Sequence, residues 1–284
     1  MSRLMPYKKL MPAEKKSTGN ETVIDLIYNF LNEPALRKLS DLSIGGTFPV
    51  SDFVLGKGCY AKQFWYCYDK SQPAQKQVFL SIEDSWNGWP RNRKESEVPT
   101  TPESEILQKP ITPFTFDDKN FDRTDITQVD QFIQQHKDGN RYAQPISRAE
   151  VKAFGKAFIE NFGGKEENKE FCYYPLAYFE NFTPETRQCV IDDFMKLGDI
   201  QYVRYYFGLD TAKDHGANRI RVVLVPVCKE QTRIQKRGVQ NDIIQLSWPP
   251  FSKKYFENEA NYEPLIEESK SILSTSEFEN AVVI

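Results

Sequence analysis

Residues 201–227 decide the fold, and they read QYVRYYFGLD, then TAKDHGAN, then RIRVVLVPV. The first run, Gln201 to Leu209, is rich in aromatic residues, and the second, Arg219 to Val227, is almost continuously aliphatic. Aromatic and β-branched residues favour strands, whereas the Asp, Gly and Asn between the runs favour turns. The pattern predicts an antiparallel β-hairpin, and a further strand is expected from Asp242 to Trp248.

Helices are predicted before this hairpin. Ser147 and Glu150 have the spacing of a capping box, apolar residues recur at helical spacing over 151–162, and two glycines follow. Thr183, followed by a proline, predicts the start of a second helix that ends at Gly198. A third helix is expected from about Thr127 to His136.

The amino-terminal part of the chain shows the same order. Apolar residues at helical spacing over 23–31 lie between Asn20, a suitable N-cap, and Pro34. Two β-rich runs, Gln63 to Tyr68 and Gln77 to Ile82, then predict a hairpin. The sequence therefore predicts an α+β fold in which helices pack on antiparallel hairpins. It leaves open whether the two units are copies of a degenerate repeat.

A proline-rich stretch separates the two units. Prolines alternate with charged and hydroxyl residues between about Asn87 and Asp125, a composition typical of linkers. We therefore expect a flexible amino terminus (1–19), a helix-plus-hairpin unit (20–90), a linker (91–125) and a larger α+β domain (126–284).

Composition limits the classes of protein to consider. The chain has 284 residues, of which 39% are hydrophobic and 13% aromatic, and such a chain can bury a substantial core. Its formal net charge of -3 does not suit a general nucleic-acid binder. Because no apolar run reaches membrane-spanning length and the five cysteines form no C-x-x-C pair, we expect no membrane association, free thiols and a cytoplasmic location.

Two segments resemble functional motifs but lack features that those motifs require. The glycines of Leu55 to Ala61 resemble a nucleotide-binding loop, but a strand is predicted after them where that loop requires a helix. The acidic segment from Asp117 has Arg123 where a calcium loop requires glycine. The chain contains only two histidines, so zinc sites with several imidazoles are excluded. We expect neither a metal nor a cofactor.

The charge pattern suggests a binding surface on the second hairpin. Arg204 to Arg237 holds eight basic residues against three acidic ones, and aromatic rings lie between them. We expect an anionic ligand or protein partner and a non-catalytic binding function, with these candidate residues: Arg204, Tyr206, Arg219 and Arg221. Single-stranded nucleic acid is compatible with such a surface but is not favoured. Alternatively, the acidic segment from Glu257 to Glu279 neutralises it.

An enzyme is the second hypothesis. His215 lies in the hairpin loop with Asp210 and Asp214 nearby, and a histidine beside carboxylates suits acid or base chemistry. The substrate would contain phosphate and would be attracted by the basic segment.

The two strand runs over 202–209 and 218–227, together with the Ser147 to Glu150 helix start, resemble a group of short uncharacterised bacterial proteins. The resemblance covers about residues 145 to 230. It implies a bacterial cytoplasmic protein of unknown role and transfers no catalytic residue.

Overall fold

The structure is a computed structural model, and it describes the following residues: 3–5, 23–54, 61–85, 106–110, 121–135, 143–163, 171–172, 176–180, 200–211, 219–228 and 243–246. The helices are α1 (Val23–Asn32), α2 (Arg37–Leu42), α3 (Ala74–Gln77), α4 (Ile126–Gln135) and α5 (Arg148–Phe162), with short 3-10 helices η1 (Pro34–Leu36) and η2 (Val50–Phe53). The strands are β1 (Arg3–Met5), β2 (Gly45–Pro49), β3 (Ala61–Tyr68), β4 (Val78–Ser85), β5 (Ile106–Pro110), β6 (Ala143–Ser147), β7 (Leu176–Glu180), β8 (Ile200–Asp210), β9 (Arg219–Cys228) and β10 (Ile243–Leu246).

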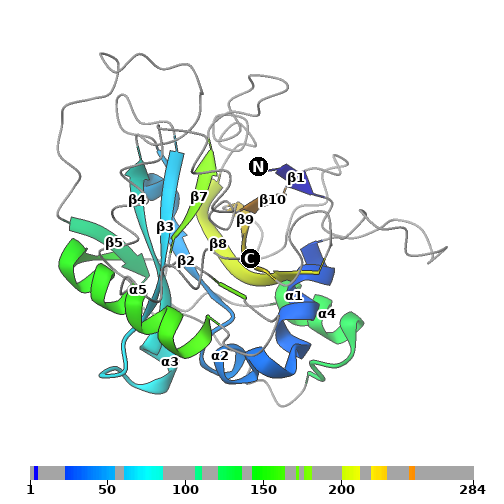
Figure 1. Cartoon of the computed structure of the whole chain (residues 1–284). Helices are drawn as coiled ribbons and strands as arrows, with labels where there is room; N and C mark the ends of the chain where they lie inside the picture. Colours follow the sequence, from blue (N-terminus) through cyan, green and yellow to red (C-terminus); the bar gives the residue numbers. More distant parts are fainter. Residues whose placement is uncertain are drawn as a thin grey trace, which may run out of the picture.

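The strands form two antiparallel sheets, in the orders β1-β10-β9-β8-β2 and β6-β5-β4-β3-β7. Helix α1 packs on β8 and helix α5 packs on β3, so each sheet carries one long helix (Figure 1). This arrangement confirms the predicted α+β class. None of the helices in the described residues has both the length and the hydrophobicity that crossing a membrane requires.

Most predicted elements are confirmed where the structure describes them. Helices α1, α4 and α5 and the hairpins β3–β4 and β8–β9 begin and end within about three residues of their expected positions, and β10 lies inside the last predicted strand. Ser147 Oγ accepts from the Glu150 backbone N–H while the Glu150 carboxylate accepts from the Ser147 N–H, so the capping box is present. The helix predicted from Thr183 to Gly198 lies outside the described residues.

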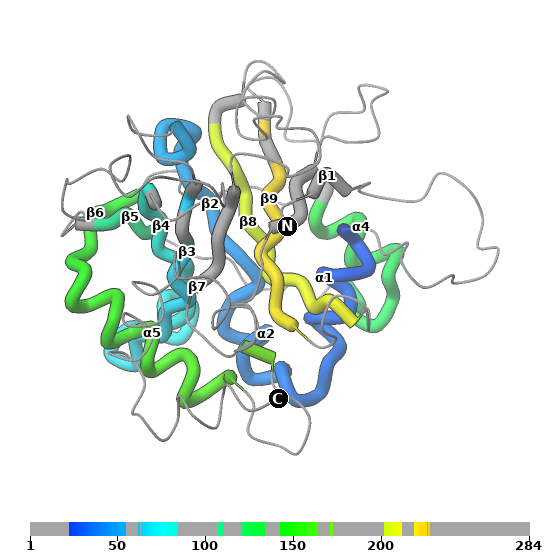
Figure 2. The backbone as a smooth tube through the Cα atoms, turned by 45° about the horizontal axis from the view of Figure 1, so that its top comes forward, coloured from blue at the N-terminus to red at the C-terminus, as the bar shows by residue number. Residues whose placement is uncertain are grey.

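The order of elements repeats along the chain. When the short helices η1, α2, η2 and α3 and the helix α4 are left out, the first half runs β1, α1, β2, β3, β4, β5, and the second runs β6, α5, β7, β8, β9, β10. Each sheet takes three strands from one half and two from the other, because β1 and β2 join the sheet of the second half while β6 and β7 join the sheet of the first. The fold is therefore an internal duplication of one topology with exchanged strands, and Figure 2 shows one of the exchanges, the blue strand β2 beside the yellow strand β8.

Four aromatic rings in a row connect the two halves. Tyr66 and Phe207 occupy equivalent positions in the two hairpins, each three residues before an aspartate, which directly follows β3 in the first hairpin and ends β8 in the second. Their ring centroids lie 5.9 Å apart. Phe158 of α5 stacks on Tyr66 at 5.3 Å, and Phe30 of α1 packs on Phe207 at 5.6 Å. All four rings are buried in one hydrophobic cluster that contains residues of both sheets.

Two observations bear on the predicted division into domains. Residues 106–110, inside the expected linker, form strand β5, and side chains on both sides of that segment share the main hydrophobic cluster. The boundary at residue 126 stays a prediction.

We predict that Phe158→Ala lowers the free energy of unfolding by about 3–5 kcal/mol, because it removes a fully buried ring from the central row. Phe154 lies on the same helix, is only partly buried and contacts Phe79, so Phe154→Ala should cost clearly less. Urea denaturation measures both. If both variants lose the same free energy of unfolding, the central row of rings has no special role in stability.

Candidate functional site

The four candidate ligand residues of the second hairpin lie on one face of their sheet. Side chains alternate along a strand, and Tyr206 is paired with Val223 while Gly208 is paired with Arg221, so Arg204, Tyr206, Arg219 and Arg221 share a side. Helices cover that side: Leu26 of α1 lies against Gly208, and Arg204 Nη1 donates to the Ile133 carbonyl of α4 at 3.4 Å. Arg204 and Tyr206 are fully buried, Arg221 is 5% exposed and Arg219 is half-buried.

Arg221 has an internal anion. Its Nη2 lies 3.1 Å and its Nε 3.2 Å from Asp210 Oδ2, and both side chains are buried. Burial lowers the pKa of Arg221, whereas the Asp210 carboxylate acts in the opposite direction. This pair neutralises charge within the hairpin itself. Binding of an external anion by Arg221 stays a prediction, and the acidic segment from Glu257 to Glu279 lies outside the described residues.

The alternative catalytic group is described only in part. Asp210 is buried against Arg221, which fixes its carboxylate in an ion pair. His215 and Asp214 lie outside the described residues, so the enzyme hypothesis stays a prediction at this site.

Exposed cations gather instead at the first hairpin. Lys70 follows β3, and its Nζ lies 6.0 Å from the ring centroid of Tyr68. Lys38 of α2 reaches Phe162 at the end of α5, with Nζ 5.7 Å from the ring centroid. The two rings adjoin edge to face, with centroids 4.9 Å apart. Each lysine therefore lies over one member of a joined aromatic pair, in the range where a cation is attracted to a ring.

The two ammonium groups make no ion pair with any described residue. The nearest carboxylate in the sequence, Asp69, is buried and accepts from the Ser71 backbone N–H at 3.0 Å and from its hydroxyl at 2.6 Å. Lys76 on α3 is a third exposed cation, and α3 contacts α2. We call the exposed side chains of Lys38, Lys70 and Lys76 the lysine surface. Its residues come from α2, the β3–β4 turn and α3, and Figure 1 shows α2 and α3 side by side.

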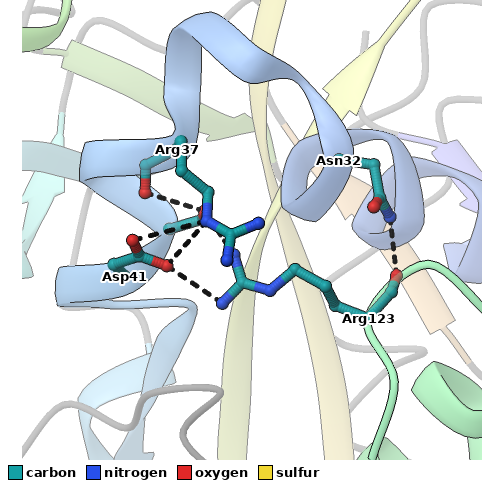
Figure 3. A network of polar contacts seen from close by, with 5 residues as sticks. Asn32, Arg37, Asp41 and Arg123 are labelled. Carbon is teal, nitrogen blue, oxygen red and sulfur yellow. Dashed lines mark hydrogen bonds and ion pairs between the residues drawn. The ribbon is translucent and has the colours of Figure 1, made fainter.

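An arginine pair borders the lysine surface. Arg37 Nε lies 3.1 Å and Arg123 Nη2 lies 3.0 Å from Asp41 Oδ1, and Figure 3 shows both guanidinium groups converging on that carboxylate. Asn32 also donates to the Arg123 carbonyl at 2.7 Å. Burial, and then the neighbouring Arg37, lower the pKa of Arg123, against the effect of Asp41. The network ties the residues ahead of α4 to α1 and α2.

A buried lysine lies elsewhere, on β3. Lys62 Nζ is 2.6 Å from Asp84 Oδ1 and donates to the Val54 carbonyl at 2.9 Å. Burial raises the pKa of nearby Asp52, and the Lys62 charge opposes that rise. These contacts hold the end of η2 to the sheet, just ahead of the glycine loop, whose residues 55–60 lie outside the described part of the chain. The Lys62 ammonium group is thus bound by Asp84 and Val54 of the protein itself.

Within the described residues, no three His, Cys, Asp or Glu side chains gather as metal ligands would. Sequence reasoning missed the lysine surface because Lys38, Lys70 and Lys76 are separated along the chain. The available signal was Lys70 alone, which lies in the predicted turn just after an aromatic strand.

Comparison with known proteins adds no relative: no family model, curated protein or solved structure matches the chain. The resemblance of residues 145 to 230 to bacterial proteins stays a prediction.

We predict that Arg221→Ala destabilises the protein by about 3–5 kcal/mol, because it leaves Asp210 buried without this counter-ion. Replacing both members by leucine should cost less than the single change, since no charge then stays buried. Chemical denaturation of the two variants at neutral pH measures the difference. A single variant as stable as the parent would show that the pair does not support the fold.

Proposed function

We propose that the protein is a non-catalytic interaction protein that binds an anionic partner at the lysine surface. One observation carries the proposal: Lys38 and Lys70 lie over the adjoining rings of Phe162 and Tyr68, exposed and without a carboxylate among the described residues. Cationic groups that the protein itself leaves uncompensated attract anions from solution.

Comparison of the two halves supports a functional role for Lys70. Asp69, directly after β3, and Asp210, the last residue of β8, occupy equivalent positions in the two hairpins, so Lys70 corresponds to Thr211 in the second half. Position 221, where the second hairpin has its internal arginine, corresponds to Phe79 in the first. The second hairpin therefore forms the equivalent turn with a threonine where the first has an exposed lysine. Lys70 is therefore not required by the architecture.

The chemistry agrees with the expectation from the sequence, but the location differs. A basic hairpin with aromatic residues was expected at residues 201–227, and the proposal transfers that role to the first hairpin. The reason is burial: α1 and α4 cover the second hairpin, whereas Lys38, Lys70 and Lys76 are exposed.

We predict that the double variant Lys38→Met/Lys70→Met weakens binding to heparin, used as a model polyanion. Methionine keeps an apolar stem over each ring while removing the charge. Since two ionic contacts are lost, the slope of log affinity against log salt should fall by about two. Retention on heparin-agarose over a series of NaCl concentrations measures it.

The matched control is Lys152→Met/Lys156→Met, which changes the net charge equally on α5. Its salt slope should stay close to that of the parent. If both double variants lose affinity equally, binding follows the total charge and the proposed surface is wrong. If the parent shows no salt-dependent binding, the proposed function itself fails.

A further inference from the structure

Each half of the chain completes the sheet of the other half. The first half adds β1 and β2 to the sheet of β8, β9 and β10, and the second half adds β6 and β7 to the sheet of β3, β4 and β5. Every residue of these four added strands has its register partner in the opposite half. The three-stranded sheet of each half is thus paired at both of its edges by strands of the other half.

One protein binds another in the same way when it adds a strand to an open sheet edge. The backbone hydrogen bonds of the added strand supply affinity, and its side chains decide which sequence fits. Helix α4 belongs with the first half, because Tyr28 Oη donates to the Thr124 carbonyl at 3.0 Å and Asn32 Nδ2 donates to the Arg123 carbonyl at 2.7 Å. The connection between the halves is therefore the segment 136–142, which lies outside the described residues.

Tyr205 distinguishes the second half from the first. It is fully buried on β8, its Oη accepts from the Leu80 backbone N–H of β4 at 3.2 Å, and its ring packs on Phe48 of β2 with centroids 5.6 Å apart. Leu80 and Phe48 both belong to the first half. The residue equivalent to Tyr205 is Phe64, which has no hydroxyl group. Two first halves could therefore not form the bond that Tyr205 makes.

Gly46 makes room for the Tyr205 ring. It is paired with Tyr205 in the register of β2 and β8, and a Cβ at Gly46 would lie 2.7 Å from the ring and from its hydroxyl oxygen. The equivalent position of β7 is Ala177, which is paired with Phe64. A strand with alanine at this position fits opposite Tyr205 only if the ring moves away from Leu80. Two second halves are therefore a poor fit to each other.

We propose that the two halves are a specific docking pair that assembles without the covalent connection, and that Gly46 and Tyr205 make each half bind the other kind. The partner that each docking surface fits is a polypeptide that adds one strand to each edge of a three-stranded sheet, and the opposite half is that partner. The inference is independent of the lysine surface, so neither stands or falls with the other.

Cleavage of the full chain tests the docking. A recognition sequence for a site-specific protease is inserted within residues 136–142, and the folded chain is cut there. In size-exclusion chromatography with light scattering, the two fragments should elute together at the mass of the uncut chain. They should regain that mass after unfolding in urea as a mixture and dilution. Elution as separate fragments, or as pairs of one fragment, would overturn the proposal.

Urea denaturation at several protein concentrations measures the strength of docking. The midpoint should rise with concentration for the cut chain and stay constant for the uncut chain, because only the cut chain dissociates when it unfolds. A midpoint that does not change with concentration in the cut chain would contradict docking of two separate polypeptides.

Substitutions in the cut chain test the specificity contact. Gly46→Ala should weaken association of the fragments by about tenfold or more, because the new Cβ displaces the Tyr205 ring. Tyr205→Leu removes the tip of that ring and should weaken association by itself, but adding Gly46→Ala to it should cause no further loss. Equal losses from Gly46→Ala in both backgrounds would overturn the role of Tyr205 while docking of the halves stands.

A milder variant covers the case in which Gly46→Ala does not fold even in the uncut chain. Tyr205→Phe keeps the ring and removes only the hydroxyl that bonds Leu80, so it should fold and should weaken association of the fragments measurably. If association is unchanged in Tyr205→Phe, the hydroxyl does not contribute to the choice of partner and the proposed specificity is wrong.

Discussion

Strand β2 pairs with β8 and strand β7 pairs with β3, and the rest of the structure depends on this exchange. Neither half completes a sheet with its own strands, because two of the five strands in each sheet come from the other half. The hydrophobic cluster contains residues of both halves, and the row of rings through Tyr66 and Phe207 lies at their junction. Contacts distant in sequence dominate such a fold, so we expect slow, cooperative folding.

The duplication also gives an internal comparison between equivalent positions. Where both halves are aromatic, as at Tyr66 and Phe207, the shared architecture explains the residue. Where one half is charged and the other is not, the architecture alone gives no explanation. Arg221, equivalent to Phe79, is explained by its ion pair with Asp210, and Lys62, equivalent to Val203, by its contacts with Asp84 and Val54. Among these charged differences Lys70 is the exposed one that has no ion-pair partner in the described residues.

Local signals predicted the long elements well. The capping box at Ser147 and the aromatic and β-branched composition of β8 are decided by neighbouring residues, and both were readable in the sequence. The short strands β1, β2, β5, β6 and β7 were not, because three to five residues carry little pattern and each strand is specified by a distant partner. Gly46 of β2 illustrates this: a Cβ there would lie 2.7 Å from the Tyr205 ring, a constraint visible only once the strands are paired. The burial of Arg204 likewise depends on α4, about seventy residues earlier.

The segment of the sequence with the most positive charge is not the part of the surface with exposed positive charge. The choice of candidate site depends on this difference. The segment with the largest positive excess places Arg204 and Arg221 beneath helices, where Arg221 has its internal anion. Lys38 and Lys70 contribute little to any local excess, yet the fold brings them onto adjoining rings. The proposed binding of an anion at this small surface acts over contact distances, so it does not depend on the net charge of -3 that the whole chain carries.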